Sequence, residues 1–233
     1  MFILRNMCRR LALTERARRV ADAFPWLGPS AASLRPRYNI APGQNVAVIL
    51  NDGRHVLSSA SWGLVAPWAR DRAAGPCLAA SRIEHLPSRP LLREALRHRR
   101  CLVLADGYFE WRAGAEGRTP HFVQLPDGRP FAIAGLWQRW HDASAPGGGG
   151  TWRTLCALLT RPIAGERRAP AIVRRDAYAA WLDPHERPPS ALTPLLTPEL
   201  PLVAYPVSRY VDRPLHDDPR CIEPAPAPDA VAS

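Results

Sequence analysis

Residues 99–112 read RRCLVLADGYFEWR, and this stretch decides how the neighbouring chain is expected to fold. Cys101 to Ala105 form a short, continuous apolar run, which is typical of a strand buried on both faces. The dipeptide Asp106-Gly107 follows, and it favours the positive φ values of a tight hairpin turn. The sequence therefore predicts two consecutive antiparallel strands joined by a turn at residues 106 and 107.

The face on which Glu110 lies decides what its carboxylate can do. Alternation along a strand places Glu110 on the same face as Tyr108. Phe109 and Trp111 then lie on the opposite face. The carboxylate is either partly shielded from water near these aromatic residues or an ordinary strand residue that faces solvent. This stretch alone leaves both interpretations open.

Further short apolar or alternating runs occur along the chain, separated by turn signals such as Asn51-Asp52-Gly53. They are residues 46–50, 55–65, 121–125, 131–137 and 154–159. This succession predicts an α+β fold in which a curled, mainly antiparallel, barrel-like sheet is flanked by short helices. Helical spacing predicts those helices over residues 14–24 with Thr14 as the N-cap, near residues 91–97, and from Asp176 onward.

The chain shows no internal repeat and no linker between two halves, so we expect one domain over residues 1–224. Residues 225–233 end a stretch, EPAPAPDAVAS, that is too poor in apolar side chains to pack, and we expect a disordered tail there. Residues 142–151, DASAPGGGGT, are expected to form a flexible insertion between two strands.

The formal net charge is +10, and the sequence contains no lysine, so all 31 basic residues are arginine. A positive excess of this size favours a polyanionic partner such as nucleic acid. The densest arginine cluster lies between Arg82 and Arg100. The alternative for this cluster is the solvated face of a short helix.

Other composition features exclude several classes of protein. No apolar run approaches the length that crosses a bilayer, and the first residues lack the pattern of a secretory signal. Five cysteines without a Cys-x-x-Cys pair argue against a disulfide framework or a cysteine-rich zinc site. We therefore expect a cytoplasmic protein that does not associate with membranes and holds no metal.

Seven sequence blocks together carry a resemblance to a known family. In order, they are MCRR (7–10), RYNIAPGQ (37–44), WGLVAPWA (62–69), RRCLVLADGYFEW (99–111), FAIAGLW (131–137), PAIVRRDAYAAWLDP (170–184) and YPVSRYVD (205–212). The chain resembles the SOS response-associated peptidase (SRAP) family of abasic-site processing proteins, and the resemblance extends over residues 7–224.

The resemblance implies a specific chemistry for Cys8. In this family the cysteine after the initiator methionine becomes N-terminal, and its α-amine and thiol condense with the aldehyde of an abasic site in single-stranded DNA. The product is a thiazolidine, because ring closure through sulfur follows imine formation. Glu110 matches the family glutamate that acts as acid and base, a role that suits the loss of water during imine formation.

The resemblance also implies residues that contact DNA. Arg10 and Arg82 match family arginines. Trp68 is a candidate platform on which an unpaired base stacks, and the alternative is a tryptophan buried in the core. Asn39 either faces DNA, as the family suggests, or caps a local turn.

Two of the four active-site positions that the resemblance implies differ in this chain. The family asparagine that holds the reacting sugar corresponds to Ala80, and the family histidine that assists proton transfer corresponds to Glu166. Glu166 retains the ability to carry a proton, although its carboxylate would repel phosphate. His85 is an alternative stand-in for the lost histidine, or an ordinary loop residue.

The sequence thus predicts an abasic-site processing protein that binds single-stranded DNA and crosslinks it through Cys8, without a cofactor. The family name adds an expectation of autoproteolytic, peptidase-like activity. The alternative is a catalytically degenerate relative that binds DNA without a covalent bond. We expect a monomer located at the nucleoid.

Overall fold

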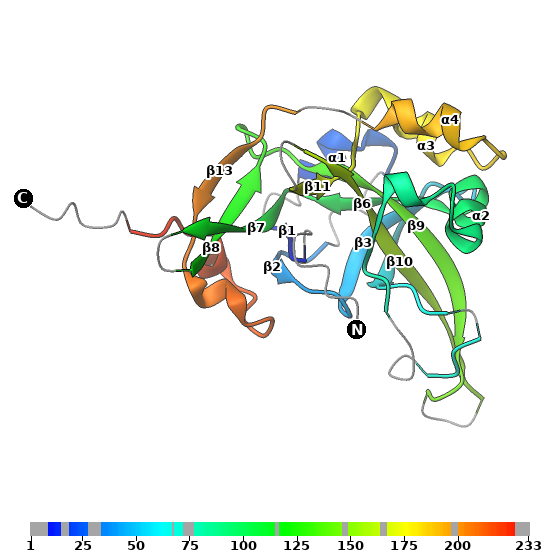
Figure 1. Cartoon of the computed structure of the whole chain (residues 1–233), viewed down its shortest axis with the longest axis horizontal. Coiled ribbons are helices and arrows are strands. Elements are labelled where there is room, and N and C mark those ends of the chain that lie inside the picture. Colours follow the sequence, from blue (N-terminus) through cyan, green and yellow to red (C-terminus); the bar gives the residue numbers. More distant parts are fainter. Residues whose placement is uncertain are drawn as a thin grey trace, which may run out of the picture.

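Two β-sheets and several short helices make up the part of the chain that the computed structural model describes (Figure 1). The α+β class predicted from the sequence is confirmed. The described residues are 9–14, 19–27, 34–66, 68–71, 77–114, 117–145, 149–163, 167–196 and 200–226.

The larger sheet contains a closed ring of five strands. They pair in the order β10-β4-β3-β6-β9, and β9 pairs with β10 again. The pairings are antiparallel except that between β10 and β4. The ring strands are β3 (Asn45–Leu50), β4 (Leu57–Trp62), β6 (Arg100–Ala105), β9 (Phe131–Asp142) and β10 (Thr151–Pro162). Short strands extend the sheet: β5 (Ala80–Arg82), β11 (Arg168–Pro170) and β12 (Ile172–Val173).

Alternating side chains of the ring strands fill the interior of this barrel. Val48, Trp62, Val103 and Cys156 are among the residues buried there. The outer face is equally apolar, which explains why residues 101–105 read as a continuous hydrophobic run. A strand of this kind needs cover on both faces, and the short helices supply the outer cover.

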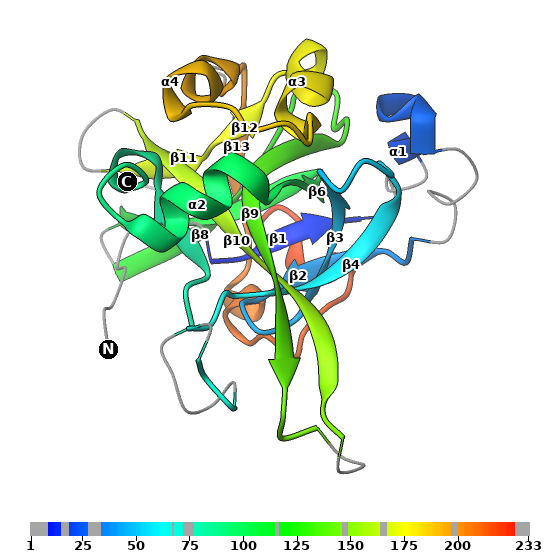
Figure 2. The ribbon, with the colours of Figure 1, turned by 90° about the vertical axis from the view of Figure 1, so that its right-hand side faces the viewer.

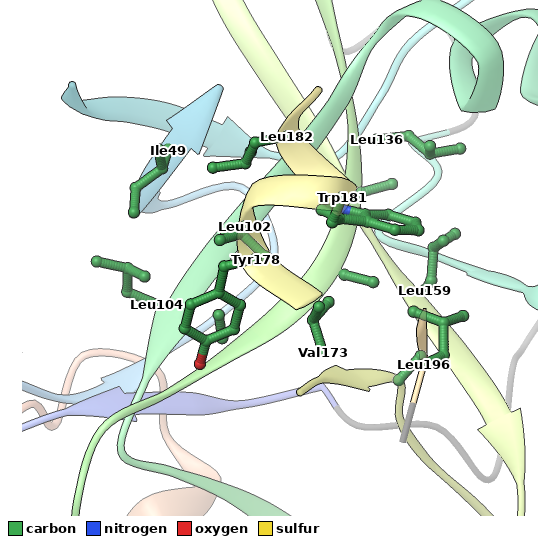
Figure 3. Packing of buried hydrophobic residues seen from close by; sticks show 14 of the residues in the cluster. Ile49, Leu102, Leu104, Leu136, Leu159, Val173, Tyr178, Trp181, Leu182 and Leu196 are labelled. Carbon is green, nitrogen blue, oxygen red and sulfur yellow. The ribbon is translucent and has the colours of Figure 1, made fainter. Parts of the chain in front are cut away.

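The helices lie against the outside of the barrel (Figure 2). They are α1 (Val20–Ala23), α2 (Pro90–His98), α3 (Tyr178–Leu182) and α4 (Pro189–Leu192), with 3-10 turns at Ile83–His85, Arg175–Ala177, Thr193–Leu195, Arg209–Asp212 and Pro219–Cys221. Figure 3 shows Trp181 and Tyr178 of α3 packed over Leu102 and Leu136. Trp181 also donates a hydrogen bond to the Cys101 carbonyl (2.9 Å), which fixes α3 on the barrel. None of the described helices is long and apolar enough to cross a membrane.

The smaller sheet has five strands in the order β13-β8-β7-β1-β2. Its strands are β1 (Leu11–Leu13), β2 (Arg37–Ile40), β7 (Gly107–Gly114), β8 (Gly117–Gln124) and β13 (Val203–Pro206). One face of this sheet packs on the barrel core through residues such as Tyr108 and Val123. The other face carries Phe109 and Trp111, so the predicted alternation along residues 108–111 is confirmed.

The predicted hairpin at residues 106 and 107 is wrong. Strand β6 belongs to the barrel and β7 to the smaller sheet, so the chain changes sheets at Asp106. Asp106 is buried, and one carboxylate oxygen accepts hydrogen bonds from both the backbone N–H and the hydroxyl of Thr14 (2.8 Å each). Thr14 therefore holds this corner instead of capping a helix, and the described helix α1 begins later, at Val20.

Position 107 requires a glycine because a neighbouring side chain packs closely against it, and not because the backbone makes a turn there. Its φ is not positive. A Cβ atom at this position would lie 2.1 Å from the ring of Phe122 on β8. The ring therefore occupies the space that any larger residue at position 107 would need.

The other expected elements agree with the structure, with longer β9 and β10 than predicted. The predicted insertion at 142–151 is the connection between these strands, and its residues 146–148 lie outside the described part. Most of the predicted tail, residues 227–233, also lies outside it. The domain limit at residue 224 stays a prediction.

Replacing Gly107 by alanine should destabilise the fold by about 1–3 kcal/mol, because the new methyl group overpacks against Phe122. Urea unfolding followed by circular dichroism measures this loss. Gly114→Ala is the matched control in the same strand, where a Cβ would lie 3.4 Å from its closest neighbour, and its effect should stay within about 0.5 kcal/mol. Equal midpoints for the two variants would contradict the packing role.

Candidate nucleic-acid site around Glu110

Glu110 lies on β7 with its side chain 12% exposed, and three side chains surround its carboxylate. One oxygen lies 3.5 Å from the hydroxyl of Tyr108. The other accepts from Arg112 (3.2 Å) and Arg167 (2.6 Å). Of the two interpretations of Glu110, the structure supports the shielded carboxylate, because the side chain is largely removed from solvent.

Arg167 ties the smaller sheet to the barrel. It immediately precedes β11, which pairs with the end of β10 at Thr160–Pro162. Its guanidinium reaches across to Glu110, so the two sheets meet at this ion pair. Arginine suits this position because its planar guanidinium stays protonated and presents several donors.

A second ion pair lies at the same end of β10. Arg168 contacts both carboxylate oxygens of Glu84 (3.1 and 2.7 Å) and the hydroxyl of Thr160 (3.2 Å). Partial burial raises the pKa of Glu84, but the hydrogen bonds from Arg168, a backbone hydrogen bond and the nearby positive charge together lower the pKa overall. The pair holds the 3-10 turn after β5 against β11.

Strand β5 places two sequence-predicted residues at this end of β10. Its parallel pairing sets Ala80 opposite Leu158 and Arg82 opposite Thr160. Ala80 is buried in the barrel core, so a packed methyl group lies at the position that the sequence analysis predicts to correspond to the family asparagine. Arg82 is exposed. Three arginines, Arg82, Arg167 and Arg168, therefore gather around residues 160–162 of β10.

Strand β1 lies beside β7, the strand that carries Glu110. Leu11 pairs with Tyr108, and the N–H of Phe109 donates to the Arg10 carbonyl (3.1 Å). Extending this register by two residues from the pair of Leu11 and Tyr108 sets Arg9 opposite Glu110. Cys8 and Glu166 lie outside the described residues, and Cys8 is covalently bound to Arg9.

Arg10 packs on the opposite face of β7 from Glu110. Its guanidinium carbon lies 5.9 Å from the centre of the Trp111 ring, and its Nη2 atom donates a hydrogen bond to the Asp212 carbonyl (3.4 Å). Trp111 donates a hydrogen bond to the Asp212 carboxylate (2.8 Å). Arg10 is partly buried in this arrangement.

Asn39 is fully buried, and its amide nitrogen donates to three backbone carbonyls, those of Val211, Arg213 and His216 (2.9–3.0 Å). Its side chain therefore holds the segment 211–216 in place and does not face solvent. Asn39 does not cap a local turn, because its partners lie more than 170 residues further along the chain, and a contact with DNA stays a prediction.

The tryptophans separate clearly by exposure. Trp68 is 77% exposed, as a stacking platform requires. Trp62 is buried and donates to the Ala79 carbonyl (2.7 Å). Trp137 is partly buried and donates to the Asn51 side chain (2.9 Å). Only Trp68 of these three has the exposure that base stacking needs.

The structure adds residues that the sequence did not single out. Arg112 and Arg167 bind the Glu110 carboxylate, and His121 on β8 lies directly opposite Glu110 on the same face of the sheet. The nitrogen Nδ1 of His121 contacts the Thr119 carbonyl (3.1 Å). The position of His121 depends on the pairing of β7 with β8. The sequence predicted a strand at residues 121–125 but not its register.

No group of three or more His, Cys, Asp or Glu side chains in the described ranges is placed to hold a metal ion.

The chain is an α+β protein in which a five-stranded barrel is joined to a smaller sheet. A shielded glutamate and a cluster of arginines lie at the junction of the two sheets. Residues 7–214 match the SOS response associated peptidase (SRAP) family. The chain belongs to this family.

Individual relatives agree with this assignment. The abasic site processing protein YoqW of Bacillus subtilis is 34% identical over 196 residues, which cover 81% of this chain and 86% of the relative. The abasic site processing protein HMCES of Gallus gallus is 27% identical over 229 residues, covering 82% of this chain and 66% of the relative. A solved structure from Bacteroides thetaiotaomicron shares the fold, with a TM-score of 0.76 at 20% identity over 94% of this chain and 100% of its own.

Replacing Asn39 by alanine should destabilise the protein by about 2–3 kcal/mol, because three backbone carbonyls in buried or partly buried contacts lose their donor at roughly 1 kcal/mol each. Hydrogen exchange should also become faster in residues 211–216. Asn45→Ala is the matched control, since Asn45 is exposed at the start of β3 and its loss should cost at most about 0.5 kcal/mol. A stable Asn39→Ala variant with unchanged exchange would refute the structural role.

Proposed function

We propose that this protein captures abasic sites in single-stranded DNA by forming a covalent bond through Cys8. Membership of the SRAP family supports the proposal, as do relatives named abasic site processing proteins. The observation that carries it is the pairing of β1 with β7, whose register, continued to Arg9, sets the residue that follows Cys8 in the sequence opposite Glu110.

The proposed reaction joins an aminothiol to an aldehyde with loss of one water. The α-amine of Cys8 attacks the aldehyde carbon of the ring-opened sugar, and the resulting hydroxyl leaves as water to give an imine. The thiol then adds to the imine carbon, and its proton ends on the ring nitrogen. Glu110 carries the protons in both steps, donating one to the departing hydroxyl and taking one from the thiol.

The absence of lysine from the sequence sharpens this proposal. Imine formation needs a primary amine, and a protein normally offers one on each lysine. Arginine stays protonated and does not replace an amine in this reaction. The free α-amine at Cys8 would therefore be the one primary amine of the processed chain.

The arginines around Glu110 address an electrostatic problem. A carboxylate in a DNA-binding site repels the phosphates that pass it. Arg112 and Arg167 neutralise the charge of Glu110, and the exposed Arg82 remains able to contact a phosphate. We propose that these cations hold the DNA backbone while Glu110 stays next to the reacting atoms.

A non-covalent DNA-binding module is the second candidate. The observation that favours it is Ala80, whose buried methyl group replaces the family amide. A protein of this kind would bind abasic DNA reversibly and give no adduct on a denaturing gel.

A chain that begins at Cys8 should give a covalent adduct with abasic single-stranded DNA, and a chain that retains residues 1–7 should give none. The reason is that the Cys8 amine is part of a peptide bond until residues 1–7 are removed, by self-cleavage or by an aminopeptidase. A denaturing gel measures the adduct, and intact mass verifies each N-terminus. An equally stable adduct from a verified unprocessed chain would refute the aminothiol reaction.

Replacing Glu110 by glutamine should slow adduct formation by roughly 10²-fold or more, because the amide keeps the shape of the carboxylate but does not accept and release a proton. Reversible binding to DNA should persist. Glu94→Gln, at an exposed position on α2, is the control and should react like the unaltered protein. A Glu110→Gln variant that reacts at the unaltered rate would remove Glu110 from the mechanism.

A further inference from the structure

Strands β9 and β10 continue past the barrel and form a projecting arm (Figure 2). We use this term for residues 138–145 and 149–154. Pairing of β6 with β9 stops at Leu136, and pairing of β4 with β10 involves only Leu155 and Cys156. Beyond these points, residues 139–142 pair with residues 151–154 alone.

A two-stranded ribbon is marginally stable in water, and one face of the arm supplies the missing support. Trp140 is buried and donates to the Ala69 carbonyl (2.7 Å), and Gln138 donates to the Val65 carbonyl (3.0 Å). Asp142 pairs with Arg153 (2.7 Å) on the same face. The arm is therefore held against the loop that carries the exposed Trp68.

The opposite face of the arm carries an open aromatic and cationic cluster. Trp152 is 61% exposed, with the ring of His141 at 5.2 Å and the guanidinium carbon of Arg139 at 5.6 Å from its centre. Gly150 adopts a φ of +65°, and a Cβ there would lie 2.4 Å from the His141 ring. The backbone is thus shaped to accommodate His141 beside Trp152.

The charges on this face indicate the chemistry of its partner. Cross-strand pairing places Arg139, His141, Trp152 and Thr154 together, and the only carboxylate of the described paired segments, Asp142, lies on the other face. A large exposed ring with a cation beside it offers a base-stacking surface and a contact for phosphate. The excess of ten positive charges on the chain favours the same partner.

We propose that the arm is a second contact surface for single-stranded nucleic acid, on which a base stacks on Trp152 and a phosphate lies near Arg139. This inference rests on the proposed function, because it extends the DNA-binding surface of the same protein.

The position of Trp152 along β10 sets the reach of this contact. Trp152 lies eight residues from Thr160, around which Arg82 and Arg168 gather. At about 3.3 Å per residue the separation is about 25 Å, which corresponds to roughly eight nucleotides stacked at ~3.4 Å each and to about four in a fully extended single strand. Only DNA that extends this far from the lesion would reach the arm.

Fluorescence anisotropy with two oligonucleotides tests the proposal. Each carries a central tetrahydrofuran analogue of an abasic site, which lacks the aldehyde and isolates reversible binding. One is about five nucleotides long, which is too short to reach the arm from a central lesion, and the other is about thirty. Trp152→Ala should weaken binding of the long oligonucleotide roughly tenfold or more and leave the short one unchanged within about twofold.

Matched variants make the result specific to the arm. Trp152→Phe keeps a stacking ring and should retain most of the affinity, and Arg139→Gln should weaken only the long oligonucleotide. Trp26→Ala is the control, because Trp26 is also well exposed (47%) but packs beside Phe24 and Tyr178, away from the arm. Unchanged melting of each variant shows that the fold is retained.

The outcomes separate this inference from the proposed function. If Trp152→Ala binds both lengths like the unaltered protein, or loses both equally, the arm proposal is wrong. A short oligonucleotide with a true abasic aldehyde is tested in parallel on a denaturing gel. If no adduct forms there but the length-dependent loss persists, the covalent function fails and the arm surface stands.

Discussion

The buried contact between Thr14 and Asp106 is the constraint on which the rest of the structure depends. Asp106 is the residue at which the chain leaves the barrel, and its carboxylate accepts both hydrogen-bond donors of Thr14. The Asp106 N–H also donates to the Ala12 carbonyl (3.0 Å). Strand β7 begins one residue later, so β1 has to lie beside it. Arg10 is thereby held beside Phe109, next to Glu110 on β7.

The site combines the shielded carboxylate of Glu110 and the more exposed carboxylate of Glu84 with arginines, in a chain that has no lysine. Glu110 binds Arg167, and Glu84 binds Arg168. Guanidinium groups attract phosphate and neutralise the carboxylates, but they do not compete as amines for an aldehyde. In the proposed reaction, the positive charge of the chain therefore adds no lysine amine that competes with the α-amine of Cys8.

The sequence predicted the strands and the alternation at residues 108–111 because both depend on local patterns of side chains. It failed at Asp106-Gly107, where two local turn formers instead serve contacts with Thr14 and Phe122, more than ten residues away. The ion pair of Arg167 with Glu110 and the position of His121 depend on strand pairing, which periodicity does not reveal. The roles of Cys8, Arg82 and Glu110 came from the family resemblance and stay proposals.

Mapping the site of the DNA adduct by tandem mass spectrometry tests the central claim most directly. The processed protein is reacted with abasic single-stranded DNA, the nucleic acid is digested, and the modified peptide is sequenced. The account predicts that the sugar remnant lies on the N-terminal Cys8, with both its amine and its thiol blocked. A remnant on the exposed thiol of Cys77, or on any other residue, would contradict it.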